Sequence, residues 1–283
     1  HSTFHIPHST FHIPHSTFHI LFVFIFLIGN SPLFGQTLPC GTPDIPLSIL
    51  EDIKSQYPPS NSAAKIPVYK VPLWIYIVRN SNGQGSNFTP SFFSEIVPSL
   101  NGWYNGVIQF TICGTTYIDK DEYFPLVTIG NGGNASALYN YVKSLNIPES
   151  DHCIRVFATN SLFVGNEAYG GFCTNPIFNF NEAGVYIAKL EASTLAHELG
   201  HYFALPHTHQ GNQPQQFVNY NCSLTGDGFC DTPADPGNNN CPIPDCPTVA
   251  CNVTDPLGVA YHPDQSLIMS YYRYCLPFRF SDE

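Results

Sequence analysis

The sequence predicts an α+β protein in which a mixed, twisted sheet, backed by helices, precedes an irregular region held together by disulfides. Three observations lead to this prediction. Apolar alternation typical of strands recurs between stretches of helical spacing over residues 66–188. A further helical pattern at 194–203 places two histidines on one face. Six of the ten cysteines then lie between Cys222 and Cys275, in a stretch dense in Asn, Pro, Gly and Asp.

The individual elements follow from the spacing of apolar residues. Residues 66–79 alternate and then become continuously apolar, as expected of a strand that enters a core. Residues 91–107 carry aromatic and aliphatic side chains at helical spacing, which indicates core packing. In chain order we expect a helix at 48–56, a strand at 66–79, a helix at 91–107, a strand at 108–113, a helix at 134–145, a strand at 153–159, and short apolar runs at 168–173 and 184–188.

The first 65 residues are expected to lie outside the main domain. Residues 1–20 repeat the heptapeptide His-Ser-Thr-Phe-His-Ile-Pro, which we interpret as a translated upstream repeat rather than a metal-binding tract, because no Met begins the chain. The apolar run at 20–28 is shorter than the ~20 residues of a membrane span and fits the core of a secretory signal. We therefore expect repeat and signal peptide at 1–35, a Pro- and Ser-rich pro-segment or linker at 36–65, and no stable membrane insertion once the signal is removed.

Charge and cysteine content limit the partners and the compartment. The formal net charge is −11, with only 10 Lys and Arg residues, which argues against nucleic acid or an anionic membrane as a partner. Solubility is the simplest interpretation of the acidic surface, with cation binding as the alternative. Ten cysteines indicate a secreted protein in an oxidising compartment. A second zinc site is the competing interpretation, although the sequence has no CxxC pair.

One stretch carries the chemistry. His197 and His201 are four residues apart, so on a helix both imidazoles point to one place, and Glu198 stands beside them to polarise a water. Pro206 indicates that the helix has already ended, and a turn after Phe203 would return His207 as a third nitrogen. Three neutral imidazoles and a water form the open tetrahedral site of catalytic zinc. The plain alternative is an amphipathic helix with two surface histidines.

These residues resemble the zinc-binding helix of the metzincins. Further on, Met269 and Tyr271 resemble the metzincin Met-turn. The resemblance implies that Met269 forms an apolar floor beneath the zinc ligands and that Tyr271 reaches the metal or the oxyanion. One position departs, because Ala204 replaces the Gly at which the helix reverses. An alanine in the left-handed conformation costs about 1 kcal/mol.

Within the metzincins, the segment Gly-Asp-x-x-x-Asp-Thr-Pro at 226–233 and the Cys-rich run resemble the pappalysin family. The resemblance implies a catalytic domain at 66–283 with an upper subdomain at about 66–207 and a lower one at about 208–283. It also implies structural calcium. The disulfides it suggests are Cys222–Cys251 and Cys246–Cys275, with Cys241 competing for either. Asp227 and Asp231 suit calcium, which prefers oxygen ligands, but acidic residues in a Gly-rich turn are also ordinary turn chemistry.

The substrate is expected to be a protein or peptide. An extended peptide would add beside the edge strand near Tyr169, Gly170 and Gly171. Family members that cut before basic residues have an acidic side chain just ahead of the cysteine that matches Cys275. Here that position is Tyr274, so we expect an apolar or aromatic preference. The chain stops at Glu283, where a metzincin begins its C-terminal helix, and we expect the sequence to be incomplete there.

Together these features predict a secreted zinc-dependent endopeptidase with Glu198 as general base. Two alternatives stay open: a binding protein without activity on the same scaffold, and a zinc amidase acting on cell-wall peptides. Cys40 also has two interpretations. A structural disulfide is favoured, and the other is a thiolate on the zinc in a latent form, as some metzincin pro-segments provide.

Overall fold

The computed structural model describes residues 40–56, 68–178, 182–210, 216–218, 220–237, 251, 253–271 and 278–281. All of them belong to one compact unit, Leu38–Glu283. The repeat and signal predicted at 1–35 lie outside the described residues. Within the described part of the chain, no helix is both long enough and apolar enough to cross a membrane.

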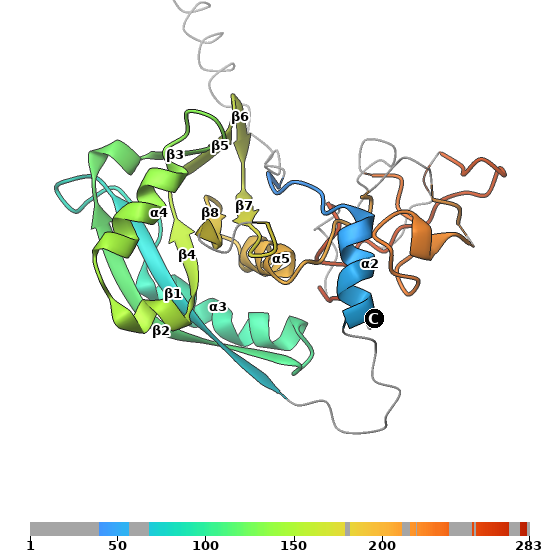
Figure 1. The fold of residues 1–283 in the computed structure, drawn as a ribbon, viewed down its shortest axis with the longest axis horizontal. Coiled ribbons are helices and arrows are strands. Elements are labelled where there is room, and N and C mark those ends of the chain that lie inside the picture. Colours follow the sequence, from blue (N-terminus) through green and yellow to red (C-terminus); the bar gives the residue numbers. More distant parts are fainter. Residues whose placement is uncertain are drawn as a thin grey trace, which may run out of the picture. The chain divides into compact units, whose positions relative to one another are not determined.

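The larger sheet has five strands in the order β2-β1-β4-β8-β7 (Figure 1). These strands are β1 (Tyr69–Arg79), β2 (Ile108–Asp119), β4 (Ile154–Ala158), β7 (Gly171–Thr174) and β8 (Gly184–Ile187). β1 runs parallel to β2 and to β4, and β4 runs parallel to β8. β7 runs antiparallel to β8 and forms the last strand of the sheet. The backbone at the outer edge of β7 can therefore pair with a further extended segment.

A second, smaller sheet was not expected from the sequence. It has the order β3-β5-β6, formed by β3 (Leu126–Ile129), β5 (Ser161–Val164) and β6 (Glu167–Tyr169). β3 and β5 are parallel, whereas β5 and β6 form an antiparallel pair. Strands this short contain too few alternations for a period of two to stand out.

The helices are α2 (Leu47–Gln56), α3 (Pro90–Trp103), α4 (Ala135–Ser144) and α5 (Ala192–Tyr202). Thr89 caps α3 by accepting a hydrogen bond from the backbone N–H of Phe92. α3 ends four residues before the predicted boundary, because Asn105 and Gly106 adopt left-handed φ angles of 48° and 71°. The short 3₁₀ turns are Asp121–Tyr123, Pro148–His152 and Cys222–Leu224. The predicted α+β class is confirmed.

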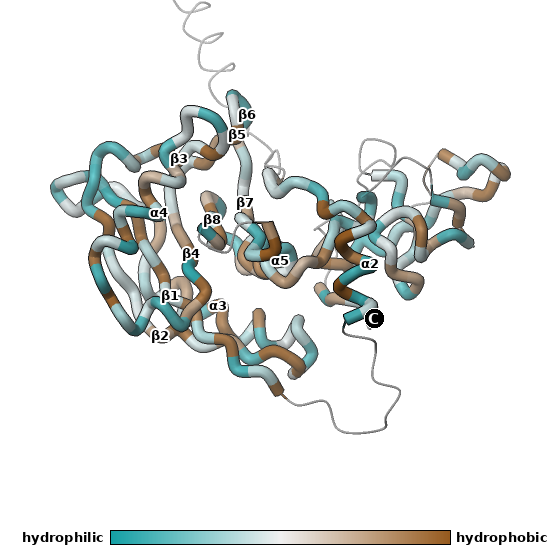
Figure 2. Tube along the Cα trace, viewed as in Figure 1, coloured by the Kyte–Doolittle hydropathy of each residue, from teal (hydrophilic) through white to brown (hydrophobic). Residues whose placement is uncertain are grey.

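Strand β1 is buried on both faces and separates two cores. Leu73, Ile75 and Ile77 contribute to the core that also contains the apolar faces of α3 and α5. Tyr76 and Val78 point the other way, into the core that contains the buried side of α4. The alternation follows from the period of two along a strand. Helix α5, which includes hydrophobic residues (brown in Figure 2), is thus held against one face of the sheet.

The bend that follows α5 is built around Ala204. Its φ angle is 68°, the left-handed conformation expected where the helix reverses. The backbone N–H of Ala204 donates to the carbonyl of His201 at 2.9 Å, and that of Leu205 donates to the carbonyl of Gly200 at 2.9 Å. This pair of bonds is a Schellman motif, in which the left-handed position is usually Gly. The bend thus forms as a helix reversal with alanine at its left-handed position, which carries a conformational cost.

Substituting Ala204→Gly is expected to stabilise the protein by about 1 kcal/mol, because Gly removes the steric cost of the left-handed φ angle. For a domain of this size that corresponds to a rise in Tm of about 2–4 °C. Thermal unfolding followed by circular dichroism measures the change. The matched control is Ala196→Gly, which lies inside α5 and should destabilise the protein. Equal destabilisation by both substitutions would show that the φ angle at 204 carries no strain.

Candidate metal centre

Helix α5 carries two of the histidines. His197 and His201 are almost completely buried and lie one turn apart on the same face. His197 Nδ1 lies 2.7 Å from the carbonyl oxygen of Ile268, and His201 Nδ1 lies 2.8 Å from that of Leu205. A carbonyl oxygen only accepts hydrogen bonds, so each Nδ1 carries the proton and each Nε2 keeps its lone pair.

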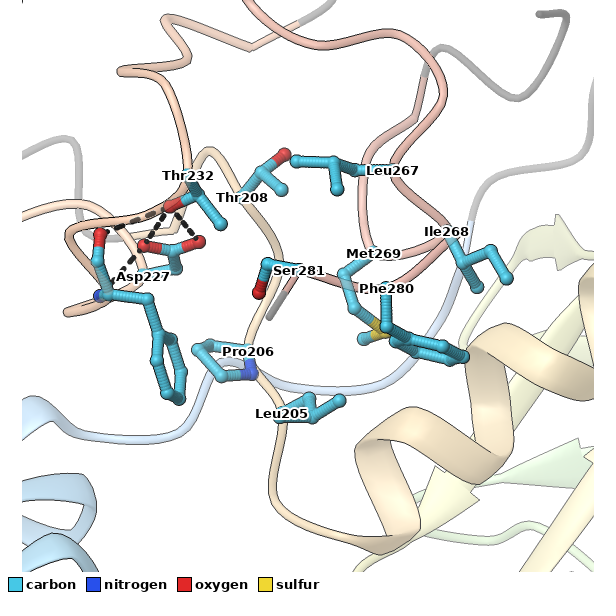
Figure 3. A pocket seen from close by; sticks show the side chains of 11 residues that line it. Leu205, Pro206, Thr208, Asp227, Thr232, Leu267, Ile268, Met269, Phe280 and Ser281 are labelled. Atoms are coloured by element: carbon cyan, nitrogen blue, oxygen red, sulfur yellow. Dashed lines mark hydrogen bonds between the residues drawn. The ribbon is translucent and has the colours of Figure 1, made fainter. Parts of the chain in front are cut away.

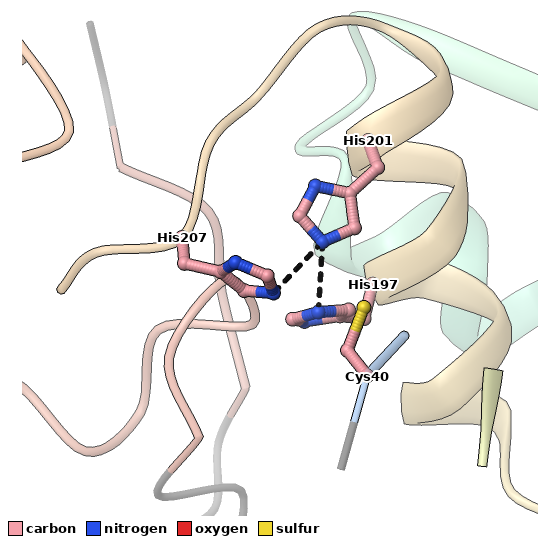
Figure 4. A group of neighbouring side chains, drawn as sticks. All are labelled: Cys40, His197, His201 and His207. Carbon is pink, nitrogen blue, oxygen red and sulfur yellow. Dashed lines mark hydrogen bonds between the residues drawn. The ribbon is translucent and has the colours of Figure 1, made fainter. Parts of the chain in front are cut away.

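His207 joins them from the loop after the bend. Its Nε2 lies 3.0 Å from Nε2 of His201, which lies 3.1 Å from Nε2 of His197 (Figure 4). Nitrogens at about 2.0–2.1 Å from a tetrahedral zinc ion would be about 3.3 Å apart. The facing lone pairs of His197 and His201 repel one another unless a cation lies between them. The donor set therefore fits a zinc ion.

A thiol completes this group. The ligand atoms of Cys40 and the three histidines all lie within 4.8 Å of one another, the one such cluster in the part of the chain that the structure describes. Cys40 is buried and stays a thiol, so the favoured expectation of a structural disulfide at Cys40 is corrected. The physical reason is its position: Cys40 forms a parallel bridge with Gly171 at the edge of β7, and its side chain lies beside His197 (Figure 4).

Glu198 lies next to the cluster and is fully buried. Its Oε2 accepts a hydrogen bond of 2.7 Å from the hydroxyl of Thr42 and lies 3.6 Å from Cys40 Sγ. The room for this carboxylate is provided by Gly171, where a Cβ would lie 2.6 Å from Glu198 Cγ. A side chain at position 171 would therefore displace the carboxylate.

Residues 40–45, here called the N-terminal strap, are fixed along the edge of β7. The backbone N–H of Gly41 donates to the carbonyl of Gly171 at 2.9 Å. The backbone N–H of Thr42 donates to Cys40 Sγ at 3.2 Å, and the Thr42 hydroxyl accepts a 2.7 Å bond from the N–H of Cys173. No sequence pattern singled out Thr42 beyond its place in Cys-Gly-Thr.

The second half of the strap contacts the loop that follows His207. Gln210 bonds both backbone groups of Ile45, accepting from its N–H at 3.3 Å and donating to its carbonyl. Asp44 Oδ1 lies 3.3 Å from His207 Nδ1. These contacts also escaped the sequence reasoning, because they join residues more than 160 positions apart.

Met269 and Tyr271 both lie at the cluster. Met269 packs beneath α5, where a Cβ on Gly200 would meet its sulfur atom. The ring of Tyr271 lies 4.9 Å from that of His207, centroid to centroid, and its hydroxyl donates to the carbonyl of Cys40 at 3.3 Å. A further neighbour not expected from the sequence is His209, whose ring stacks on His207 and whose pKa is lowered by burial.

The residues predicted to bind substrate differ in their contacts. Gly171 lies at the edge of β7 and pairs with the strap. Gly170 precedes it and accepts a backbone bond from Ala188 at 2.8 Å, while the hydroxyl of Tyr169 donates to Glu167 at 2.8 Å. Tyr274 lies outside the described residues.

The disulfide pattern differs from the one that the resemblance implied. Cys222 bonds to Cys230 rather than to Cys251, with an S–S distance of 2.01 Å. The reason is local, because Gly226 and Gly228 adopt left-handed φ angles and fold the loop back within eight residues. Cys251 is disulfide-bonded as well. The predicted partners Cys246 and Cys275, and the competing Cys241, lie outside the described residues.

Of the two aspartates expected at a calcium site, Asp227 makes the hydrogen bonds of a turn. Asp227 Oδ1 accepts a 3.0 Å bond from the backbone N–H of Phe229, two residues on, and both carboxylate oxygens accept from the Thr232 hydroxyl. Among the described residues, no cluster of three or more His, Cys, Asp or Glu ligand atoms includes Asp227 or Asp231. Burial raises the pKa of Asp227 to about 7, and the hydrogen bonds only partly offset it.

The raised pKa of Asp227 predicts a pH-dependent stability. The folded protein holds this proton up to pH about 7, whereas the unfolded chain releases it near pH 3.8. Between these values the unfolded state binds fewer protons, so the free energy of unfolding falls as pH rises, by up to about 4 kcal/mol from this residue. Urea unfolding between pH 4 and 8 measures it.

The control for this prediction is Asp227→Asn, which keeps the size but cannot titrate. The fall in stability across the window should become shallower in this variant, and an unchanged slope would contradict the raised pKa. Repeating the pH 8 measurement with added calcium tests the calcium prediction separately. Stabilisation by calcium in the natural protein, lost in Asp227→Asn, would support that site.

A small pocket lies beside the Met-turn segment (Figure 3). Its wall is mainly apolar and includes Leu205, Pro206, Met269 and Phe229. Asp227 contributes a carboxylate to the lining, and the hydroxyl of Thr232 donates a hydrogen bond to it. The pocket is thus mostly hydrophobic.

The fold and this site together define an α+β protein with a three-histidine centre of the kind found in metallopeptidases. The sequence pattern of the M43 peptidase family, described as pregnancy-associated plasma protein-A, matches residues 153–267. That match, which includes all three histidines and Glu198, confirms the resemblance to the pappalysin family. No curated protein matches the chain.

Two solved structures are similar at low identity. One is mature mirolysin from Tannerella forsythia in complex with a cleaved peptide, which is 15% identical in sequence and has a TM-score of 0.43. The similarity covers 72% of the present chain and 84% of the mirolysin chain. Metalloproteinase-II from Bacteroides fragilis is 13% identical with a TM-score of 0.36, covering 64% of this chain. The present chain spans half of the length of metalloproteinase-II.

Proposed function

We propose that the protein is a secreted zinc-dependent endopeptidase whose catalytic domain covers residues 66–283. The observation that supports it most is the convergence of three Nε2 lone pairs beside the buried carboxylate of Glu198. Secretion is supported by the Cys222–Cys230 disulfide, because such bonds persist in oxidising compartments. Calcium at Asp227 and Asp231 stays a prediction.

His197, His201 and His207 would hold the zinc ion. When bound, zinc supplies Lewis-acid activation of a water and of the scissile carbonyl. Glu198 acts as the general base, which takes a proton from the attacking water and passes it to the leaving amine. Its burial beside the three histidines favours this role. The hydroxyl of Tyr271 donates a hydrogen bond to the developing oxyanion.

The substrate is an extended peptide that lies along the edge of β7. This is supported by the strap, since Gly41 already makes a main-chain bond there to Gly171. The pocket beside Met269, with a volume of about 20 Å³, is too small to receive a substrate side chain. The apolar or aromatic preference, with Tyr274 in the specificity pocket, stays a prediction.

In the form described here the enzyme would be latent. Cys40 Sγ lies among the histidine ligands, and Thr42 holds Glu198 by a 2.7 Å bond, so the strap blocks the metal and the base together. α2 extends this contact, because Lys54 donates to the carbonyl of Gly228 at 2.6 Å and stacks over the ring of Phe229. Activation would require release of residues 40–56, which would correspond to the predicted pro-segment.

Digestion of casein and of a defined peptide library tests the proposal. The chain, treated with a thiol-blocking reagent to release Cys40, is expected to cleave internal peptide bonds, and a chelator should stop the reaction. Cleavage of cell-wall peptides but not of casein would favour the amidase alternative. Zinc binding without cleavage of either would favour the binding-protein alternative.

A further inference from the structure

A second cavity, of about 340 Å³, plays no part in the chemistry proposed above. Phe172 and Thr174 of β7 form one side, and Tyr186 of β8 lies beside them. The opposite side is formed by the loop after β3 and the start of α4, including Ser136. Its volume is at the lower end of the range for ligand sites, about 300–1,000 Å³.

The cavity is negatively charged. Glu182 is the one acidic or basic side chain among its lining residues. Its Oε2 accepts a 3.2 Å bond from the hydroxyl of Ser136. No ion pair formed by the described residues includes Glu182. Burial raises the pKa of Tyr186, so that phenol stays neutral. A carboxylate that no cation of the described residues pairs with, in a cavity whose other described walls are neutral, selects a positively charged group.

The cavity lies on the other face of β7 from the metal centre. Gly171 faces Glu198, and Cys173 is buried in the core of α5. The residues between and after them point the opposite way, since side chains alternate along a strand. The side chains of Phe172 and Thr174 therefore lie on the α4 side of β7 and line the cavity.

The strap shows how a chain at this edge distributes its side chains. Cys40 and Thr42 turn towards the metal centre, where they contact Glu198. Gly41 lies between them, and a Cβ there would be 3.3 Å from Phe172 Cδ2 and 2.9 Å from Val164 Cγ2. A peptide in the same place would thus send alternate side chains to the Phe172 face, where the position of Gly41 has room only for a small residue.

From these observations we infer that the cavity is a specificity subsite for a lysine or arginine side chain of the peptide substrate. This inference rests on the proposed peptidase function. In the bound peptide, the basic residue is two positions from the residue that lies where Gly41 lies in the strap. Side chains two positions apart share a face of an extended chain, and the next one on this face lies beside Thr174. Its ammonium or guanidinium group pairs with Glu182, while its methylene groups pack on Phe172 and Tyr186.

The test compares Glu182→Gln with the full chain in a peptide digest. Both carry Cys40→Ala and Thr42→Val, which remove the thiol from the metal centre and the hydroxyl that holds Glu198. In a peptide library with internal Lys and Arg, the cleaved peptides are expected to prefer a basic residue at one position. This position is fixed relative to the cleaved bond and is two residues from a position that prefers a small residue. For a matched peptide pair with Lys or Gln at that position, the ratio of kcat/KM should fall at least ~10-fold in Glu182→Gln.

Two further variants make the outcome specific. Glu182→Lys should reverse the preference towards Asp or Glu, and Glu95→Gln, which removes an exposed charge on α3, should keep it. Cleavage without a basic preference, or a preference that survives Glu182→Gln, would overturn the inference and leave the peptidase proposal standing. Absence of any cleavage by the chain that carries both Cys40→Ala and Thr42→Val would instead overturn the peptidase proposal and the inference with it.

Discussion

Replacing Glu198 with glutamine is expected to lower peptide hydrolysis by about 10²–10⁴-fold while the zinc stays bound. Glutamine has nearly the same size and keeps an oxygen for the hydroxyl of Thr42, but it cannot take a proton from water. Because this side chain is not one of the proposed metal ligands, the affinity of the three histidines for zinc should be unchanged. Single-turnover cleavage of a fluorogenic peptide and metal content are measured on the same preparation.

A matched control is Glu191→Gln, which removes a carboxylate at the N-terminus of the same helix. It should change the rate little, because this side chain pairs with Lys189 away from the metal centre. Full turnover by Glu198→Gln would remove Glu198 from the role of general base. Loss of both activity and metal would show instead that this residue is required to build the site.

The second large effect is expected from the strap. Cys40→Ala should raise the activity of the untreated chain on the order of 100-fold, because the metal centre loses its blocking thiol. Thr42→Val should raise it by about 10–100-fold, since losing a hydrogen bond to a charged group costs roughly 1.5–3 kcal/mol. The double variant should be the most active. Initial rates on a fluorogenic peptide, without thiol reagent, measure the release.

Two variants separate this effect from a general loosening of the fold. Cys113→Ala removes an exposed thiol from β2 and should leave the chain latent. Thr42→Ser keeps the hydroxyl and should stay close to the natural chain. Equal basal rates for Cys40→Ala and the natural chain would contradict latency through Cys40, provided that thiol-blocked protein is active.

The sequence was informative where the controlling interactions are local. The spacing of His197 and His201 predicts a shared helix face, and Pro206 predicts the helix end and the turn after Phe203 that returns His207. The structure has that helix, a left-handed Ala204 and the three rings together. Each of these depends on backbone geometry within a few residues. Met269 beneath the helix follows instead from the resemblance, because its contact with Gly200 joins distant parts of the chain.

Features that depend on distant pairing could not be predicted in this way. Thr42 donates a hydrogen bond to Glu198, which is 156 positions away in the sequence. The tripeptide Cys-Gly-Thr does not indicate that this segment pairs with the edge of a sheet. The pairing of Cys222 with Cys230 depends on left-handed glycines in one loop, whereas six cysteines allow 15 pairings in principle. The cavity at Glu182 forms between segments about fifty residues apart, so it exists only in the folded chain.

The most direct test of the whole account is the metal content of the purified protein, measured by elemental analysis alongside His207→Ala. One zinc ion per chain in the natural protein, with weaker binding in His207→Ala, is the predicted result. A natural protein that takes up no transition metal, or one whose zinc affinity is unchanged in His207→Ala, would contradict the three-histidine centre.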